Sequence, residues 1–149
     1  MVKLLLLAFL SAAASFAAPV AAQQTSIDSA EAASGARQKL VIQVSDNDPV
    51  KWNLALNNAR NVQSELGKEN VDIEIVAYGP GLNMVLAESV AANRVNTALG
   101  ENVSVVACDN TMHSMKLGEA DLMGGIRHVK AGVVHLMQRQ RAGWAYIRP

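Results

Sequence analysis

The chain has 149 residues, half of them hydrophobic and 17% charged, as is typical of one globular domain with a modest core. Its 13 basic and 13 acidic residues balance and form no basic patch, so no nucleic-acid partner is expected. The single cysteine, Cys108, excludes an internal disulfide and a thiolate metal site.

The N-terminus has the pattern of a secretory signal peptide. Lys3 precedes an apolar run over residues 4–10, and small residues follow, with Val20 and Ala22 at positions −3 and −1 of a cleavage site. A membrane helix is the alternative, but the strongly apolar run is short for a bilayer. We therefore expect residues 1–22 to be removed, which leaves 12 basic and 13 acidic residues, a formal charge of −1 and a periplasmic protein with no membrane segment.

Residues 23–38 are small or polar with a single isoleucine, and they are interpreted as a flexible linker before the domain at 39–149. The apolar run at 39–44 predicts the first strand, and 45–48 its exit loop. Asp48 is the expected cap of a helix that begins at Pro49 and ends at Leu66. Gly67 is expected to end this helix in the left-handed conformation.

The second strand is predicted over residues 71–78, where apolar and polar residues first alternate and the sequence then becomes wholly apolar. Gly79-Pro80-Gly81 is interpreted as a plain turn, because Pro80 lacks the amide hydrogen that a phosphate-binding loop needs. Residues 82–87 predict a short helix. Residues 90–99 predict a longer helix that Gly100 terminates.

The third strand is predicted over residues 103–107 and is expected to be buried. Three residues of types that cap helices follow it: Asp109, Asn110 and Thr111. A short helix is predicted at 112–117, an irregular crossover at 118–125 and a brief strand at 127–130. A helix at 132–141 and a strand at 144–147 complete the pattern. Alternating strands and helices predict an α/β fold, a mainly parallel sheet with helices on both faces.

Ligands of parallel α/β sheets bind beyond the carboxyl ends of the strands, where three exit loops should meet here. The polar residues that these loops bring together are Asp46, Asn47, Tyr78, Cys108, Asn110 and Thr111. Helix amides beside Cys108 would stabilise its thiolate, whereas Asp109 would oppose this. His113, five residues further on, could face the thiolate, and the favoured alternative is an exposed surface histidine, because nothing in the sequence fixes its orientation. The alternative is an inert cysteine packed in the core, since free cysteine is often buried.

The remaining residue types predict no metal site and no cofactor, because His128 and His135 lack metal-ligand spacing. The methionines are interpreted as core or subunit contacts. Several apolar side chains lie outside the helical stripes, and we expect them to be exposed and to favour subunit association: Leu82, Val85, Leu122 and Met123.

Several separated segments, in order, resemble the DsrE/DsrF-like family. They are VIQVSDNDP, WNLALNNA, EIVAYGPG, VACDNTM, AGVV and the terminal GWAYIRP, and the resemblance extends over residues 39–149. It implies a three-layer α/β/α sandwich with a five-stranded, mainly parallel sheet that assembles into trimers or hexamers. It also implies sulfur relay, because the well-understood members are cytoplasmic proteins that carry a persulfide on one cysteine.

Cys108 is the position that could take this persulfide role, and the chain departs from the pattern in its export signal and its lack of a second cysteine. The first hypothesis is a periplasmic sulfur carrier with protein donors and acceptors of sulfur. In it, Cys108 holds the sulfur, Asn110 and Thr111 hold the anion, and Asp46, Asn47 and Tyr78 shape the pocket. The alternative is a small-ligand-binding or protein-binding oligomer without catalysis, in which Cys108 only packs.

Overall fold

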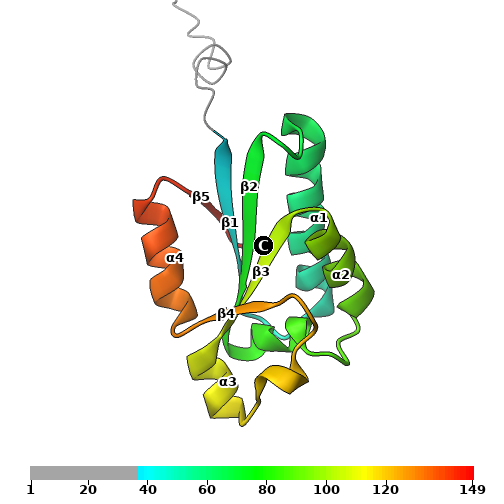
Figure 1. Cartoon of the computed structure of the whole chain (residues 1–149), viewed down its shortest axis with the longest axis vertical. Helices are drawn as coiled ribbons and strands as arrows, with labels where there is room; N and C mark the ends of the chain where they lie inside the picture. Colours follow the sequence, from blue (N-terminus) through cyan, green and yellow to red (C-terminus); the bar gives the residue numbers. More distant parts are fainter. Residues whose placement is uncertain (1–36) are drawn as a thin grey trace, which may run out of the picture. The chain divides into compact units, whose positions relative to one another are not determined.

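The computed structural model describes residues 37–149. The expected signal peptide at 1–22 and nearly all of the expected linker at 23–38 lie outside these residues. Within them, a five-stranded sheet has the order β4-β3-β2-β1-β5, and all four strand pairings are parallel (Figure 1). The strands are β1 Gln38–Val44, β2 Val71–Ala77, β3 Val103–Cys108, β4 Arg127–Val129 and β5 Ala145–Ile147.

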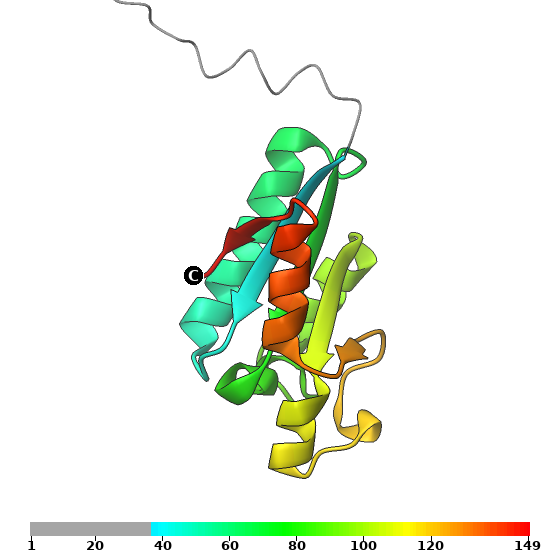
Figure 2. The ribbon, with the colours of Figure 1, turned by 90° about the vertical axis from the view of Figure 1, so that its left-hand side faces the viewer.

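Helices cover both faces of the sheet, as the alternation of strands and helices predicts. Their bounds are α1 Pro49–Leu66, η2 Gly79–Val85, α2 Ala92–Gly100, α3 Asp109–Met115, η3 Glu119–Asp121 and α4 Gly132–Arg141. α1 and α2 pack on one face and α4 on the other (Figures 1 and 2). No helix within residues 37–149 has both the length and the apolar character needed to cross a membrane.

The two faces of the sheet have different cores. On the side of α1 and α2, alternate residues of the central strands join the buried residues of both helices in one large apolar cluster. On the side of α4, the buried cluster consists of Val41, Val76, Val106 and Leu136. Because the central strands are buried on both faces, they are apolar along most of their length.

The start of α1 is as predicted. The Asp48 carboxylate accepts a hydrogen bond from the Val50 amide at 2.9 Å, and Pro49 occupies the first turn. At the other end, Gly67 has the expected positive φ of 87°, but its ψ of 137° lies outside the left-handed helical region. The prediction of a left-handed cap is therefore wrong in ψ, because the chain extends at once toward β2.

The short helices begin earlier than predicted. Instead of an α-helix at 82–87, a 3₁₀ helix begins at Gly79. Gly81 allows this, because a Cβ there would lie 2.4 Å from the carbonyl oxygen of Val44. α3 begins at Asp109 and not at residue 112, so Asp109, Asn110 and Thr111 form its first turn and no side chain caps it.

The apolar residues expected at the surface are buried. Leu82 and Val85 are fully buried in η2, and Leu122 and Met123 are 8% and 7% exposed. The Met123 amide donates to the Val85 carbonyl at 3.0 Å, so the crossover before β4 folds onto η2. The expectation that these four side chains remain exposed is wrong, because the crossover covers them.

Candidate functional site

Cys108 lies where β3 ends and α3 begins, as expected. It is the last residue of the strand and occupies the N-cap position of the helix, and only 5% of its surface is exposed. The adjacent strand β4 pairs with it through Val129, and the N-terminus of α4 lies beside it. The thiol is therefore placed between the first turns of two helices.

Hydrogen-bond donors surround the sulfur. The Gly132 amide, in the first turn of α4, donates to Cys108 Sγ at 3.2 Å. The Thr111 hydroxyl also faces the sulfur. The same hydroxyl accepts a hydrogen bond from the Gly79 amide at 2.9 Å, which leaves its proton for the sulfur. When the backbone amides in the first turn of a helix point at an atom, they stabilise a negative charge on that atom.

These donors outweigh the effect of burial on the thiol. Burial raises the pKa of Cys108, but hydrogen bonds from the Gly132 amide, the Thr111 hydroxyl and amide, and the Asn110 amide lower it further, so that the pKa lies below its usual value. The carboxylate of the neighbouring Asp109 is paired with His128 Nδ1 at 2.7 Å. The site therefore favours a thiolate.

Gly132 allows the N-terminus of α4 to approach Cys108 closely. From the sequence, Gly132 was expected only to begin a helix. A Cβ at this position would lie 3.2 Å from Tyr78 Cβ and 3.3 Å from Cys108 Cβ. A larger residue here would require its neighbours Tyr78 and Cys108 to shift by a few tenths of an ångström. The signal available in the sequence is the glycine in the AGVV segment, whose close approach to β2 and β3 becomes visible only in the fold.

The exit loops of β2 and β3 and the loop after β4 are joined at this edge of the sheet. The Asn110 amide donates to the Lys130 carbonyl at 3.1 Å, in addition to the Thr111 contact described above. Two pockets lie on either side of Asn110. One, of about 510 Å³, is lined by Gly79, Pro80, Asn83, Asn110, Thr111, Ser114 and Met115. The other, of about 440 Å³, is lined by Asn110, Val129, Lys130, Ala131, Val134, His135 and Gln138.

The structure brings part of the expected site together. Tyr78 and Thr111 lie around Cys108, and Asn110 borders both pockets. Asp46 lies in the loop after β1. Because β2 lies between β1 and β3, this loop starts about 10 Å from the strand that ends at Cys108.

Asp46 forms ion pairs with Lys51 at 3.2 Å and Arg148 at 3.5 Å, and the Lys51 hydrogen bond is the largest cause of its lowered pKa. Asn47 and His113 are exposed, and within residues 37–149 no hydrogen bond joins either of them to Cys108. Residues 37–149 also contain no group of three or more His, Cys, Asp or Glu side chains arranged to hold a metal ion.

The comparisons with known proteins bear on this fold. The solved structure of MTH1491 from Methanobacterium thermoautotrophicum, a protein of unknown function, is 36% identical in sequence with a TM-score of 0.72; the match covers 75% of this chain and 99% of that one. The chain belongs to the same family as MTH1491. No protein-family model and no curated protein matches the sequence.

Two further solved structures resemble this chain in fold alone. BT1422 from Bacteroides thetaiotaomicron, also of unknown function, is 14% identical with a TM-score of 0.62, and the match covers 75% of this chain and 95% of that one. The ychN protein from E. coli is 12% identical with a TM-score of 0.62, covering 76% and 99%. The three-layer sandwich of these neighbours confirms the expected α/β/α fold with its five-stranded parallel sheet.

This member of the MTH1491 family also has a buried charge that the sequence reasoning missed. Glu74 on β2 is 1% exposed and is contacted by Arg127 at 2.6 Å, by His135 at 2.6 Å and by Arg139 through two hydrogen bonds of 2.9 and 3.0 Å. Burial raises the pKa of Glu74, but hydrogen bonds from Arg139 and His135 lower it further, below the usual value. A charged residue in an alternating stretch is typical of the exposed face of a strand, so the pattern of residues 71–74 did not signal this burial.

Proposed function

We propose that this protein is an exported, single-cysteine member of the DsrE/DsrF-like family that carries sulfane sulfur as a persulfide on Cys108. The observation that carries the proposal is the 3.2 Å hydrogen bond from the Gly132 amide to Sγ, at a cysteine whose pKa is below its usual value. A thiolate is both the nucleophile and the leaving group that sulfur transfer requires. The DsrE-like fold supports the assignment to this family.

In the loading step, the Cys108 thiolate attacks the outer sulfur of a persulfide or of thiosulfate. A bond forms between the two sulfurs, and the bond to the leaving thiolate or sulfite breaks and gives it the electron pair. In the unloading step, an acceptor thiolate attacks the outer sulfur, and Sγ leaves as a thiolate. The Gly132 amide and the Thr111 hydroxyl stabilise Sγ in both steps.

The pocket bordered by Asn110 and Thr111 is the proposed binding site for a small donor. A protein donor or acceptor would cover a wider part of the same edge. We assign to this wider contact surface the residues Asp46, Asn47 and His113. None of them is hydrogen-bonded to Cys108 within the described residues.

The test is the intact mass of the protein, purified without reductant and then exposed to thiosulfate or polysulfide. The expected result is a gain of one sulfur, about 32 Da, that reductant removes and that is absent from Cys108→Ser. Thr111→Ser keeps a hydroxyl and is the matched control that should still load. A Cys108→Ser protein that gains the same reducible mass would contradict the proposal.

The burial of the thiol favours a second candidate function, a small-ligand-binding oligomer without catalysis. Cys108 is 5% exposed and lines neither adjacent pocket, so its sulfur is covered in this conformation. This candidate expects the native thiol to resist alkylation, whereas the unfolded protein reacts at the rate of a free thiol. Rapid alkylation of the native protein would exclude it.

Export and assembly complete the proposal. We expect the mature protein in the periplasmic fraction to begin at Gln23, which N-terminal sequencing would show. We also expect a trimer or hexamer in light scattering, because α4 exposes Val133, Val134 and Met137 to about half of their surface. Replacement of Met137 by Glu should then favour the monomer. A wild-type monomer at micromolar concentration would contradict the assembly.

A further inference from the structure

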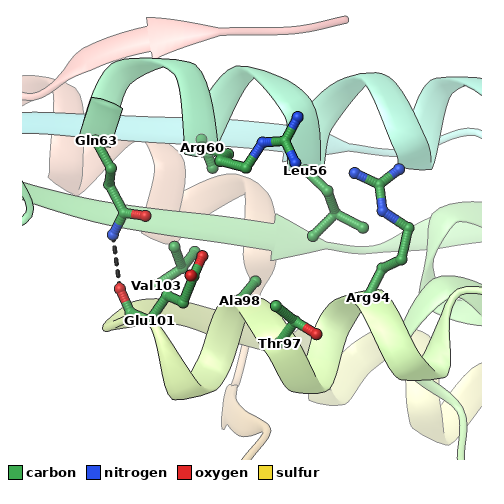
Figure 3. A pocket seen from close by; sticks show the side chains of 9 residues that line it. Leu56, Arg60, Gln63, Arg94, Thr97, Ala98, Glu101 and Val103 are labelled. Atoms are coloured by element: carbon green, nitrogen blue, oxygen red, sulfur yellow. Dashed lines mark hydrogen bonds between the residues drawn. The ribbon is translucent and has the colours of Figure 1, made fainter. Parts of the chain in front are cut away.

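A second pocket lies between α1 and α2, away from Cys108. Its volume is about 120 Å³ (Figure 3). Apolar side chains form its inner wall, among them Leu56, Ala98 and Val103. Polar groups come from Gln63, Arg60 and Arg94. Figure 3 shows the side chains of Gln63 and Arg94 between the two helices and that of Arg60 along α1.

Gln63 points an unsatisfied acceptor into this pocket. The residue is 4% exposed, and its Nε2 donates to the Glu101 carbonyl at 2.7 Å. Because a carbonyl oxygen only accepts, this bond fixes the orientation of the amide. Oε1 then has no hydrogen-bond partner among residues 37–149. A buried acceptor without a donor is unfavourable, so the pocket is suited to a ligand that supplies one.

The pocket also has uncompensated positive charge. The Arg94 guanidinium is held by the neutral amides of Asn53 and Asn57, at 2.5 and 2.7 Å. Arg60 is exposed, and neither arginine forms an ion pair within the described part of the chain. The acid at the rim, Glu101, is paired with Lys68 at 3.0 Å. These charges favour an anion.

We propose that this pocket binds a small hydroxycarboxylate, with its carboxylate at Arg60 and its hydroxyl donating to Gln63 Oε1, while Arg94 of α2 adds positive charge further along α1. The apolar wall receives the carbon atoms between the two groups. A simple carboxylate satisfies Arg60 but leaves Gln63 Oε1 unpaired, whereas a hydroxycarboxylate satisfies both groups. The site is thus independent of the chemistry of Cys108.

Glycolate and propionate form the matched probe pair, because they have the same number of non-hydrogen atoms and differ only in a hydroxyl against a methyl group. In an NMR titration of the ¹⁵N-labelled protein, glycolate should shift the amide signals of Gln63 and Glu101 and bind about fivefold more tightly than propionate, the ratio for one neutral hydrogen bond. Millimolar affinity is expected for ligands of this size. No saturable shift, or equal affinities, would overturn the proposal.

Variants then separate the two parts of the site. Gln63→Met should bind the two acids with equal affinity, because the acceptor is gone. Arg60→Gln changes an exposed side chain that the fold does not need, and it should weaken both acids several-fold. Arg141→Gln, at an exposed arginine of α4, is the matched control and should leave both affinities unchanged. Cys108→Ser should also bind glycolate normally; a loss there would instead place the acid at the cysteine.

Discussion

The two faces of the sheet are stabilised in different ways. The face toward α1 and α2 buries one large apolar cluster, whereas the face toward α4 combines four buried apolar residues with the ion cluster around Glu74. Cys108 lies on the second side, with the first turn of α4 bonded to its sulfur. The apolar face supplies stability, and the other face can therefore hold buried charge and the buried thiol.

The largest expected effect tests this division with the same substitution on both faces. Leu82→Ala, at a fully buried residue of the large cluster, should reduce the free energy of unfolding by about 4–5 kcal/mol. Leu136→Ala, in the small cluster, should cost about 2–3 kcal/mol, because its surroundings near solvent can relax into the cavity. Urea unfolding measures both. Equal losses would show that the two faces are equally well packed.

The next effect concerns the ion cluster. Glu74→Gln leaves Arg139 and Arg127 without their carboxylate, and we expect it to cost about 3 kcal/mol at pH 7. Because folding lowers the pKa of Glu74, its contribution is present above the unfolded value of about 4.3 and is lost as the pH falls through the folded value.

Wild type and Glu74→Gln should therefore converge in stability at low pH. Urea unfolding of both proteins at neutral pH and at acid pH provides the measurement. A constant difference between them across this range would show that the cost comes from packing and not from charge.

A smaller effect sharpens the description of the thiol. Thr111→Val removes the hydroxyl that faces Sγ and should raise the pKa of Cys108, so that the thiolate fraction at a pH below the pKa falls. The ultraviolet absorbance of the thiolate, followed against pH, gives this value. Thr111→Ser should titrate like wild type. If Thr111→Val also does so, the backbone amides alone hold the anion.

The smallest effect is at the surface between α3 and β4. The hydrogen bond that His128 donates to Asp109, followed by the charges of Asp109 and Glu119, raises the pKa of His128. Its contribution to stability is complete below the unfolded pKa of about 6.5 and is lost as the pH rises through the folded value. An NMR titration should show the raised pKa in wild type and a lower one in Asp109→Asn. An unchanged value in that variant would assign the shift to Glu119.

Local patterns predicted the central architecture of the described domain. Asp48 and Pro49 signal the start of α1, and β-branched runs signal β1, β2 and β3, because these effects depend on neighbours in sequence. The position of Cys108 at a strand end follows from the same pattern. Helix starts at Gly79 and Asp109 were missed because 3₁₀ turns and an uncapped first turn leave weak local signals.

Only the tertiary structure decided what surrounds the thiol and what lies beneath α4. The sequence by itself determined that Cys108 ends a strand, but Gly132 reaches its sulfur from 24 residues away. Glu74 alternates like an exposed residue, and it is buried because Arg127, His135 and Arg139 come to it from β4 and α4. Hydrogen bonds and ion pairs between distant segments depend on how the sheet is ordered, and a local pattern of residues does not contain that order.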